Sequence, residues 1–288
     1  LFNAIDPHSY TVHPYKRPTI GSIEDLEAAS LPDVIAFHQT FYRPDNATLI
    51  VAGDFDPKQL DAWVDQYFGW IPKPAAPIPQ VTAQEPKRKK NLRYTVTSET
   101  APLPAVALTW LLPPASDTAD RIPLQVAAAL LSQGDSSRLY QSLVYRHQVA
   151  QRVGADADGR VGPGLFTAYA ILASGHQPAE AEKLLHEEII WLATQPIPAA
   201  ELDKVKTQLL TSELKQRQTA QGLAFALGQA TLIDGNPEHV NTDLAALQKV
   251  SEQDVHRVLQ KYVTGAHSVT IDYLPQPAGA ATTSGAAK

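Results

Sequence analysis

The chain has 288 residues, 44% of them apolar, and a formal net charge of −6. That length predicts two domains, and the apolar fraction is high enough for both to bury cores. The negative net charge argues against a nucleic-acid partner, because nucleic-acid-binding domains concentrate basic residues on one face. The absence of cysteine excludes disulfide bonds and thiolate metal sites and leaves the redox compartment open.

The lengths of the apolar runs and the first residues of the sequence test for membrane spans and signal peptides. No stretch approaches the ~20 consecutive apolar residues of a transmembrane helix, so no membrane span is predicted, and no signal peptide stands at the start. The sequence contains no methionine and begins at Leu1. We therefore expect the chain to be a piece of a longer polypeptide.

The most informative element in the first part of the chain is a helix that reappears near the end. The stretch SLPDVIAFHQTFYRPDNATL, residues 30–49, aligns without gaps with SEQDVHRVLQKYVTGAHSVT, residues 251–270. In both copies a Ser stands three residues before an Asp, which is a helix-capping pattern, and an apolar stripe at i, i+3 and i+7 follows. A β-type run closes each copy, at residues 47–51 and 268–271. The agreement favours an internal duplication.

A proline-rich segment, residues 72–90, separates the two copies. Its five prolines predict an extended linker, because proline fixes φ and lacks a ladder donor. The basic run Lys87–Lys90 is interpreted as a solvated linker end, with a docking patch as the alternative. Residues 1–71 are then the C-terminal part of a first domain, which by the repeat offset begins about 130 residues before Leu1.

The second domain is expected at residues 91–275, followed by a small, polar and disordered tail at 276–288. Alternation and turn residues predict strands at 91–98, 105–112, 153–157, 165–172 and 268–271. Helical patterns cover 119–133, 137–147, 180–194 and 199–233, the last with Gly222 and Gly228 inside and so expected to be kinked. Early strands, late helices and a returning strand predict an α+β fold in which helices pack on a mainly antiparallel sheet.

Residue types alone do not compose an active site. None of the nine histidines stands four residues from another with a Glu between them, the spacing that binds zinc on one helix face. We interpret each histidine as solvated or locally hydrogen-bonded. The segment Gly134–Ser137 lacks the second glycine of a nucleophile elbow, and Gly162–Gly164 lacks the Lys of a phosphate-binding loop.

Three segments of the sequence resemble those of a known family. They are similar, in sequence and in order along the chain, to segments of the pitrilysin, insulinase and mitochondrial processing peptidase family. The segments are HPYKRPTIGSIEDLEAAS (residues 13–30), FYRPDNATLIVAGDFDP (residues 41–57) and GDSSRLYQSLVYRHQVAQRVGA (residues 134–155). The members of the family are zinc metallopeptidases that pair a His-x-x-Glu-His domain with a homologous inactive domain. The resemblance implies that the duplication reflects these paired α+β domains, and that zinc and its general-base Glu belong to a segment before Leu1.

The resemblance also implies a departure in the second domain. Many relatives carry an Arg and, seven residues later, a Tyr that hold the substrate backbone and stabilise the oxyanion. Val144 and Gln151 occupy these positions here. Paired half-length bacterial subunits divide the zinc site and the Arg/Tyr pair between two chains, which implies that this chain is the C-terminal part of a zinc-bearing-type subunit that works with a homologous partner or as a dimer.

For the intact protein the resemblance implies a zinc endopeptidase that closes as a clamshell around peptides or unfolded proteins. This chain lacks the His-x-x-Glu-His motif, so it is expected to hold no zinc and to be inactive alone. The resemblance gives four candidates for residues that line the substrate cleft, which are Arg138, Tyr140, Arg146 and Arg152. The alternative interpretation is that the arginines are ordinary surface residues on a helix and a strand. A non-catalytic scaffold subunit of the same family is the alternative function, and an unrelated binding module is a third. The absence of cysteine and the Pro/Ala-rich linker and tail favour a bacterial periplasm or cell envelope.

Overall fold

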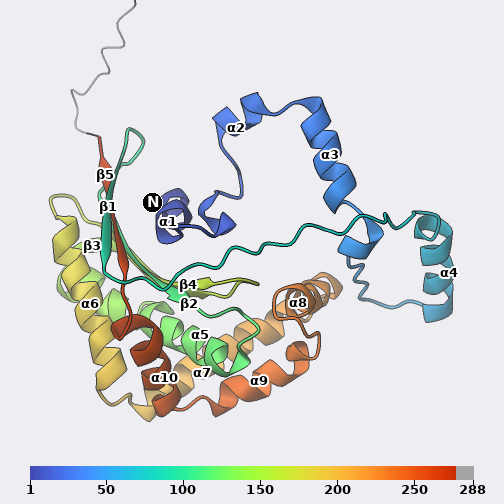
Figure 1. Ribbon diagram of the computed structural model, residues 1–288. Coiled ribbons are helices and arrows are strands. Elements are labelled where there is room, and N and C mark those ends of the chain that lie inside the picture. Colours follow the sequence, from blue (N-terminus) through green and yellow to red (C-terminus); the bar gives the residue numbers. More distant parts are fainter. Residues whose placement is uncertain (277–288) are drawn as a thin grey trace, which may run out of the picture.

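The computed structural model describes residues 1–276, and its centre is one five-stranded sheet (Figure 1). The tail predicted to be disordered, 276–288, lies outside the described residues except for Gln276. The strand order is β1-β5-β2-β4-β3, with β1 and β5 parallel and the other neighbours antiparallel. The strands are β1 Leu92–Ser98, β2 Ala105–Leu112, β3 Ala150–Asp158, β4 Gly164–Leu172 and β5 Val269–Pro275. The predicted α+β fold with a mainly antiparallel sheet is confirmed.

The helices fall into two groups, before and after the linker. Those that precede it are α1 Phe2–Ser9, α2 Ile23–Ala28, α3 Leu31–Phe41 and α4 Pro57–Phe68, with short 3₁₀ turns at Pro14–Lys16 and Pro44–Asn46. Those that follow it are α5 Thr118–Ser132, η3 Tyr140–Arg146, α6 Pro178–Thr194, α7 Ala199–Gln216, α8 Ala220–Leu232, α9 His239–Lys249, α10 Glu252–Leu259 and η4 Gln260–Thr264. No helix within residues 1–276 is both long and apolar enough to cross a bilayer.

The larger core lies between one face of the sheet and the helices that follow the linker. Alternate residues of β2, among them Leu108 and Trp110, point into this core and meet Phe166 of β4. Helices α5, α6 and α10 close it from the other side, below the sheet in Figure 1. A strand alternates its side chains between two faces, so the intervening residues of β2 need a second cover.

Helix α1 supplies that second cover. Ala4, Ile5 and Tyr10 pack against Ala107 of β2 and Ile271 of β5 in a smaller core, and Ser9 Oγ lies 2.8 Å from Thr109 Oγ1 (Figure 1). The central strand β2 is thereby buried on both faces. Residues 1–10 thus pack with the second unit, although they precede the linker in sequence.

Two linker residues fix the same region. The Glu85 carboxylate accepts hydrogen bonds from the backbone N–H groups of Thr11, Val12 and His13 at 2.7–3.0 Å. Arg88 donates to the carbonyl oxygens of Thr109, at 2.6 Å, and of Ser9, at 2.8 Å. Burial lowers the pKa of this guanidinium to about 10. The expectation of a solvated linker end is therefore wrong for Arg88, while the neighbouring lysines are exposed.

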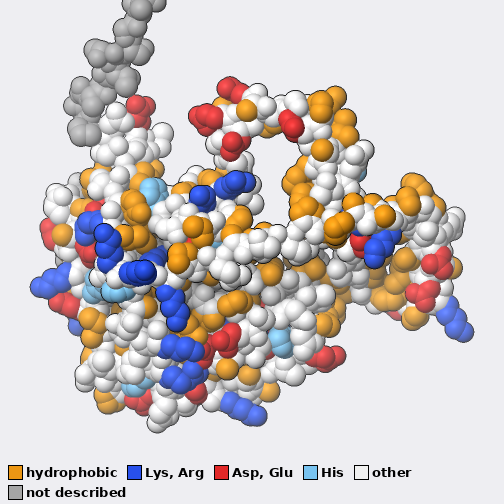
Figure 2. All heavy atoms as spheres, in the orientation of Figure 1, with side chains coloured by type: hydrophobic (Ala, Val, Ile, Leu, Met, Phe, Trp, Pro, Cys, Tyr) orange, Lys and Arg blue, Asp and Glu red, His pale blue; other side chains and the backbone are white. Residues whose placement is uncertain are grey.

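The segment between these contacts, residues 17–84, forms an arc beside the sheet (Figure 1). Hydrophobic side chains gather on the surface at α3 in Figure 2. The exposed apolar residues of the arc include Ile20, Leu26, Leu31, Val34, Phe37 and Trp70. The strand predicted at residues 47–51 is wrong: these residues form neither a strand nor a helix. A strand needs a hydrogen-bonded neighbour, and no strand of the described chain lies beside them.

The kink predicted within 199–233 is a complete break between α7 and α8. Thr219 Oγ1 accepts a hydrogen bond from the Gly222 N–H at 3.0 Å and so caps α8. A Cβ atom on Gly222 would stand 1.6 Å from the Gln216 carbonyl oxygen at the end of α7. Glycine is therefore required where the second helix starts so close to the first.

Candidate functional site

The predicted cleft segment begins with Arg138, which is held inside the helical layer. Its guanidinium makes two hydrogen bonds of 2.9 Å to the Glu201 carboxylate at the start of α7 and lies over the Trp191 ring of α6. Paired, planar contacts of this kind fix an Arg rather than leave it free for a ligand. In this structure Arg138 joins α6 to α7.

The other three candidates are more exposed. Arg146, at the end of the π-helix η3, is half exposed and makes a 3.2 Å ion pair with Glu188 of α6. Tyr140 opens the same π-helix and is partly exposed, and Arg152 is exposed on β3. No hydrogen bond or ion pair within residues 1–276 joins any two of the four candidates, and their role in a cleft stays a prediction.

Strand β3 offers one open edge of the sheet. It lies at the end of the strand order, with β4 as its strand neighbour. A register shift between Ala150 and Arg152 marks a bulge at Gln151. A bulge breaks the alternation of side chains, so Gln151 and Arg152 are both exposed although they are consecutive. Val144, the other position of the family pair, packs partly against the larger core from η3.

The family's zinc motif has no counterpart in this sequence. The chain contains no His-x-x-Glu-His, and two of its histidines, His13 and His176, make local contacts. His13 is buried beside Tyr10 and Tyr15 and accepts a 3.3 Å hydrogen bond from the Tyr15 N–H. His176 pairs with Glu180 at 2.7 Å on the surface of α6. The residues present therefore do not fit the family's catalytic zinc.

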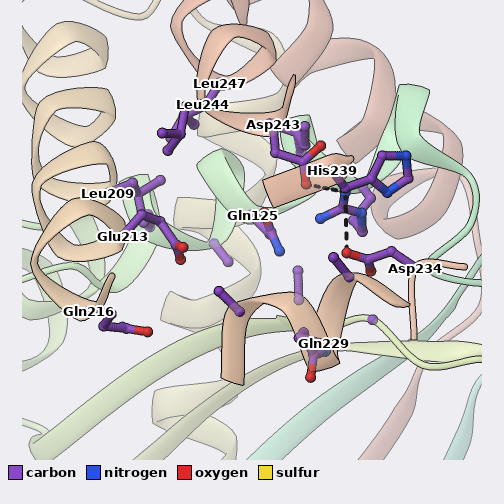
Figure 3. Close-up of a pocket in the computed structure, with 18 of the residues that line it drawn as sticks. Gln125, Leu209, Glu213, Gln216, Gln229, Asp234, His239, Asp243, Leu244 and Leu247 are labelled. Carbon is purple, nitrogen blue, oxygen red and sulfur yellow. Dashed lines mark hydrogen bonds and ion pairs between the residues drawn. The ribbon is translucent and has the colours of Figure 1, made fainter. Parts of the chain in front are cut away.

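A cavity lies elsewhere, among α5, α7, α8, α9 and β3 (Figure 3). Its volume is about 600 Å³, and its lining is rich in acidic and amide side chains. The polar and charged lining residues are Arg121, Gln125, Ser132, Gln133, Asp156, Asp158, Glu213, Gln216, Arg217, Gln229, Asp234, His239 and Asp243. Five carboxylates against two guanidiniums give this cavity a negative balance, which favours a cationic ligand.

Three potential ligands gather at one side of the cavity. Asp234 precedes α9, and His239 and Asp243 stand four residues apart on α9, so that they share one helix face. One ligand atom from each lies within 4.8 Å of the others. The Arg121 Nη2 is 2.5 Å from Asp243 Oδ2 and 3.8 Å from Asp234 Oδ2. Burial raises the pKa of Asp234, with the Asp243 charge adding to the rise against the opposing effect of Arg121.

Sequence reasoning missed this cluster. The pattern of two histidines four residues apart with a Glu between them does not cover His239, whose partner four residues later is Asp243. The spacing of His239 and Asp243 was visible as an i, i+4 pair. The approach of Arg121 and Asp234 was not, because it depends on how α5 and α9 pack.

The comparisons with known proteins agree on one family. Residues 28–209 match the peptidase M16 inactive domain. The chain is 25% identical over 274 residues to "Zinc protease PqqE" of Helicobacter pylori, which covers 93% of the chain and 60% of that protein. It is 22% identical over 285 residues to "Probable mitochondrial-processing peptidase subunit beta" of Schizosaccharomyces pombe, covering 91% of the chain and 59% of that protein.

The fold has a counterpart in a solved structure. A crystal structure of a protease from Helicobacter pylori superimposes with a TM-score of 0.88 at 22% identity, covering 94% of this chain and 65% of that one. The chain spans about 60% of the length of the two curated relatives. The resemblance inferred from the sequence is confirmed, because the match to the inactive domain extends over residues 28–209 of 288. This chain belongs to the peptidase M16 family.

Proposed function

We propose that this chain forms the non-catalytic wall of a peptide-binding clamshell in a zinc-dependent endopeptidase, and that cleavage requires a separate zinc-bearing domain. The observation that carries the proposal is a fully formed α+β unit of the M16 inactive-domain type in a chain without His-x-x-Glu-His. Such a unit can bind and orient a peptide but lacks the metal and base for hydrolysis. The named zinc proteases among its relatives support this assignment of roles.

Strand β3 is the part of the wall that meets the peptide in this proposal. The free N–H and C=O groups of an edge strand pair readily with an extended peptide, and this mode accepts many sequences because the backbone supplies the hydrogen bonds. Arg152 extends from that edge and is free to contact a peptide carboxylate or carbonyl. Unfolded segments meet this requirement, whereas folded proteins keep their backbone groups paired.

A homologous partner completes the site in this proposal. The Val144 side chain cannot donate a hydrogen bond, so this chain does not offer the family's Arg at that position. A partner that carries the Arg and Tyr would then supply the oxyanion contacts. One relative is named as the beta subunit of a peptidase, which supports a multisubunit arrangement. A bacterial cell envelope, as the composition favours, is part of the same proposal.

Peptide binding to this chain tests the wall. A fluorescein-labelled unfolded peptide with acidic residues is titrated with the chain, and binding is followed by polarisation. Arg152→Ala is expected to weaken the affinity about tenfold, the loss of one charge-assisted hydrogen bond, with an unchanged melting temperature. Lys183→Ala, which removes an exposed positive charge from α6, is the matched control and leaves the affinity unchanged. Equal affinities for the two variants would remove Arg152 and the β3 edge from the site.

Reconstitution tests the division of labour. The full-length polypeptide is mixed with a homologous subunit bearing the Arg and Tyr, and hydrolysis of a quenched fluorescent peptide is followed. Cleavage is expected to rise by orders of magnitude over either component alone. Peptide binding without any gain in cleavage would refute the split site and favour the scaffold subunit. The present chain alone serves as the negative control.

A further inference from the structure

We propose that Asp234, His239 and Asp243 form a binding site for a divalent transition-metal cation, with Zn²⁺ as the ion to test first. The site lies in the inactive-domain unit and is separate from the family's His-x-x-Glu-His zinc. The proposal does not rest on the proposed function, because it concerns cation binding by this chain without a peptide or a partner.

The donor set suits such an ion. Imidazole and carboxylate are the nitrogen and oxygen ligands that zinc accepts, and a His and an Asp at i and i+4 present their donors on one side of a helix. Ligand atoms around tetrahedral zinc lie about 3.3 Å apart, as follows from bonds of about 2.0 Å. The three donor atoms lie within 4.8 Å of one another, so rotations of the side chains, without movement of the helix, close the gap.

The burial of these donors is an independent observation. The Asp234 side chain is 9% exposed, its carboxylate accepts no hydrogen bond within residues 1–276, and its ion-pair contact with Arg121 spans 3.8 Å, so that its oxygens are available to a ligand from the cavity. The His239 Nδ1 is buried and also has no hydrogen-bond partner in the described chain. Buried polar groups are normally satisfied, and each exception calls for a ligand or another cause. Figure 3 shows both residues beside Asp243 at the same side of the cavity.

Arg121 holds the cation position in the present structure. Its Nη2 contacts Asp243 Oδ2 at 2.5 Å, while its Nε is buried and unpaired. A guanidinium places one charge beside two carboxylates, whereas a divalent ion neutralises both and also binds the imidazole. We infer that the metal displaces Arg121 from between the two aspartates. The cavity gives room for the displaced side chain and leaves the outer face of the ion open to water.

Calorimetry on the chelator-treated 288-residue chain tests the site directly. Titration with ZnCl₂ is expected to show one site with submicromolar affinity, and Co²⁺ is expected to give the visible absorption of a four-coordinate centre. His239→Ala should weaken the binding more than about 100-fold, since loss of an outer-sphere contact alone costs 10- to 100-fold. The imidazole nitrogen is unpaired, so this variant keeps its fold, which circular dichroism verifies.

Two further variants make the test specific. His176→Ala removes a His that also contacts an acid four residues later, Glu180, but is in no three-ligand cluster of the described chain, and should leave binding unchanged. Arg121→Gln removes the competing guanidinium and should tighten binding about tenfold. Absence of binding by the parent chain, equal losses in the two His variants, or an Arg121→Gln affinity that is unchanged or weaker would each overturn the proposal.

Discussion

The two copies of the duplicated segment fold alike locally and differ entirely in burial. In both, the Ser N–H donates to the carboxylate of the Asp three residues later at 3.0 Å, Ser30 to Asp33 and Ser251 to Asp254. The next position carries valine in each copy. Val34 is 57% exposed on α3, whereas Val255 is 0% exposed on α10. Hydrogen bonds within a few residues determine the helix, and contacts with other elements determine what the helix contributes to stability.

One buried carboxylate, that of Asp120, helps to explain why the second copy is buried and the first is not. Asp120 of α5 is buried and accepts hydrogen bonds from Lys261 at 2.7 Å and Tyr262 at 2.6 Å, and also from Arg257. The matching positions of the first copy are Ala36, Thr40 and Phe41, which have no cationic group. The second copy is therefore held to the helical layer by charge as well as by its apolar stripe.

The largest effect is expected from a charge placed in each stripe. Val255→Asp buries a carboxylate without a partner and should lower the free energy of unfolding by about 4 kcal/mol or more, enough to unfold the unit. Val34→Asp, at the matching exposed position, should change it by less than about 0.5 kcal/mol. Urea denaturation followed by circular dichroism measures both. Similar losses in the two variants would show that α3 is buried in solution.

An intermediate effect on stability is expected from the replacement of Asp120. Burial by itself would raise the pKa of Asp120, but the hydrogen bonds from Lys261, Tyr262 and Arg257 outweigh it and lower the pKa to about 2. Because the pKa is lower in the folded state, the stabilisation is present above the unfolded value of ~3.9 and is lost as the pH falls through about 2.

Asp120→Asn should therefore cost about 2 kcal/mol at neutral pH, a figure reduced by the partial exposure of Lys261 and Arg257. The difference from the parent chain should shrink between pH 4 and pH 2, which a series of melting curves measures. Asp61→Asn, at an exposed position of α4 in the arc, is the control for a general loss of carboxylate charge. A difference that does not depend on pH would show that the charge of Asp120 is not what stabilises α10.

The smallest effect is expected from the caps. Ser251→Ala removes a cap from a buried helix and should cost about 1 kcal/mol of unfolding free energy. Ser30→Ala removes the same cap from an exposed helix, so α3 should fray while global unfolding is unchanged. The Ser side chain lowers the pKa of Asp33 and of Asp254, and NMR titration should show both values return upward in the respective variants. Equal costs in denaturation would contradict the difference in burial.

Much of the second unit could be predicted from the sequence. Residues 105–112 form β2 with the predicted bounds, because β-branched and apolar residues there end at a Pro-Pro turn. Residues 47–51 carry an equally good strand pattern and form none, since pairing depends on a neighbour that no local pattern reveals. The covering of the sheet by α1 was likewise out of reach, because it joins residues about a hundred positions apart.

The site was less predictable than the fold. The resemblance to the family made Arg138 a cleft candidate, but its bidentate pairing with Glu201 comes from the packing of α7 against the segment after α5. The cluster around Asp234 combines a helix-spaced pair with an Arg from a distant helix. Spacing within an element can be inferred from sequence, whereas a meeting of elements needs the tertiary structure.

The hydrogen bonds of Glu85 and Arg88 have a further consequence for the arc. They clamp its outgoing end beside its incoming end, so residues 17–84 form a closed loop whose two ends are held at the sheet without any disulfide. A protease that cuts this exposed loop would leave two fragments bound to one another through α1 and the strands. The nicked protein would migrate as one species under native conditions and separate only in denaturant.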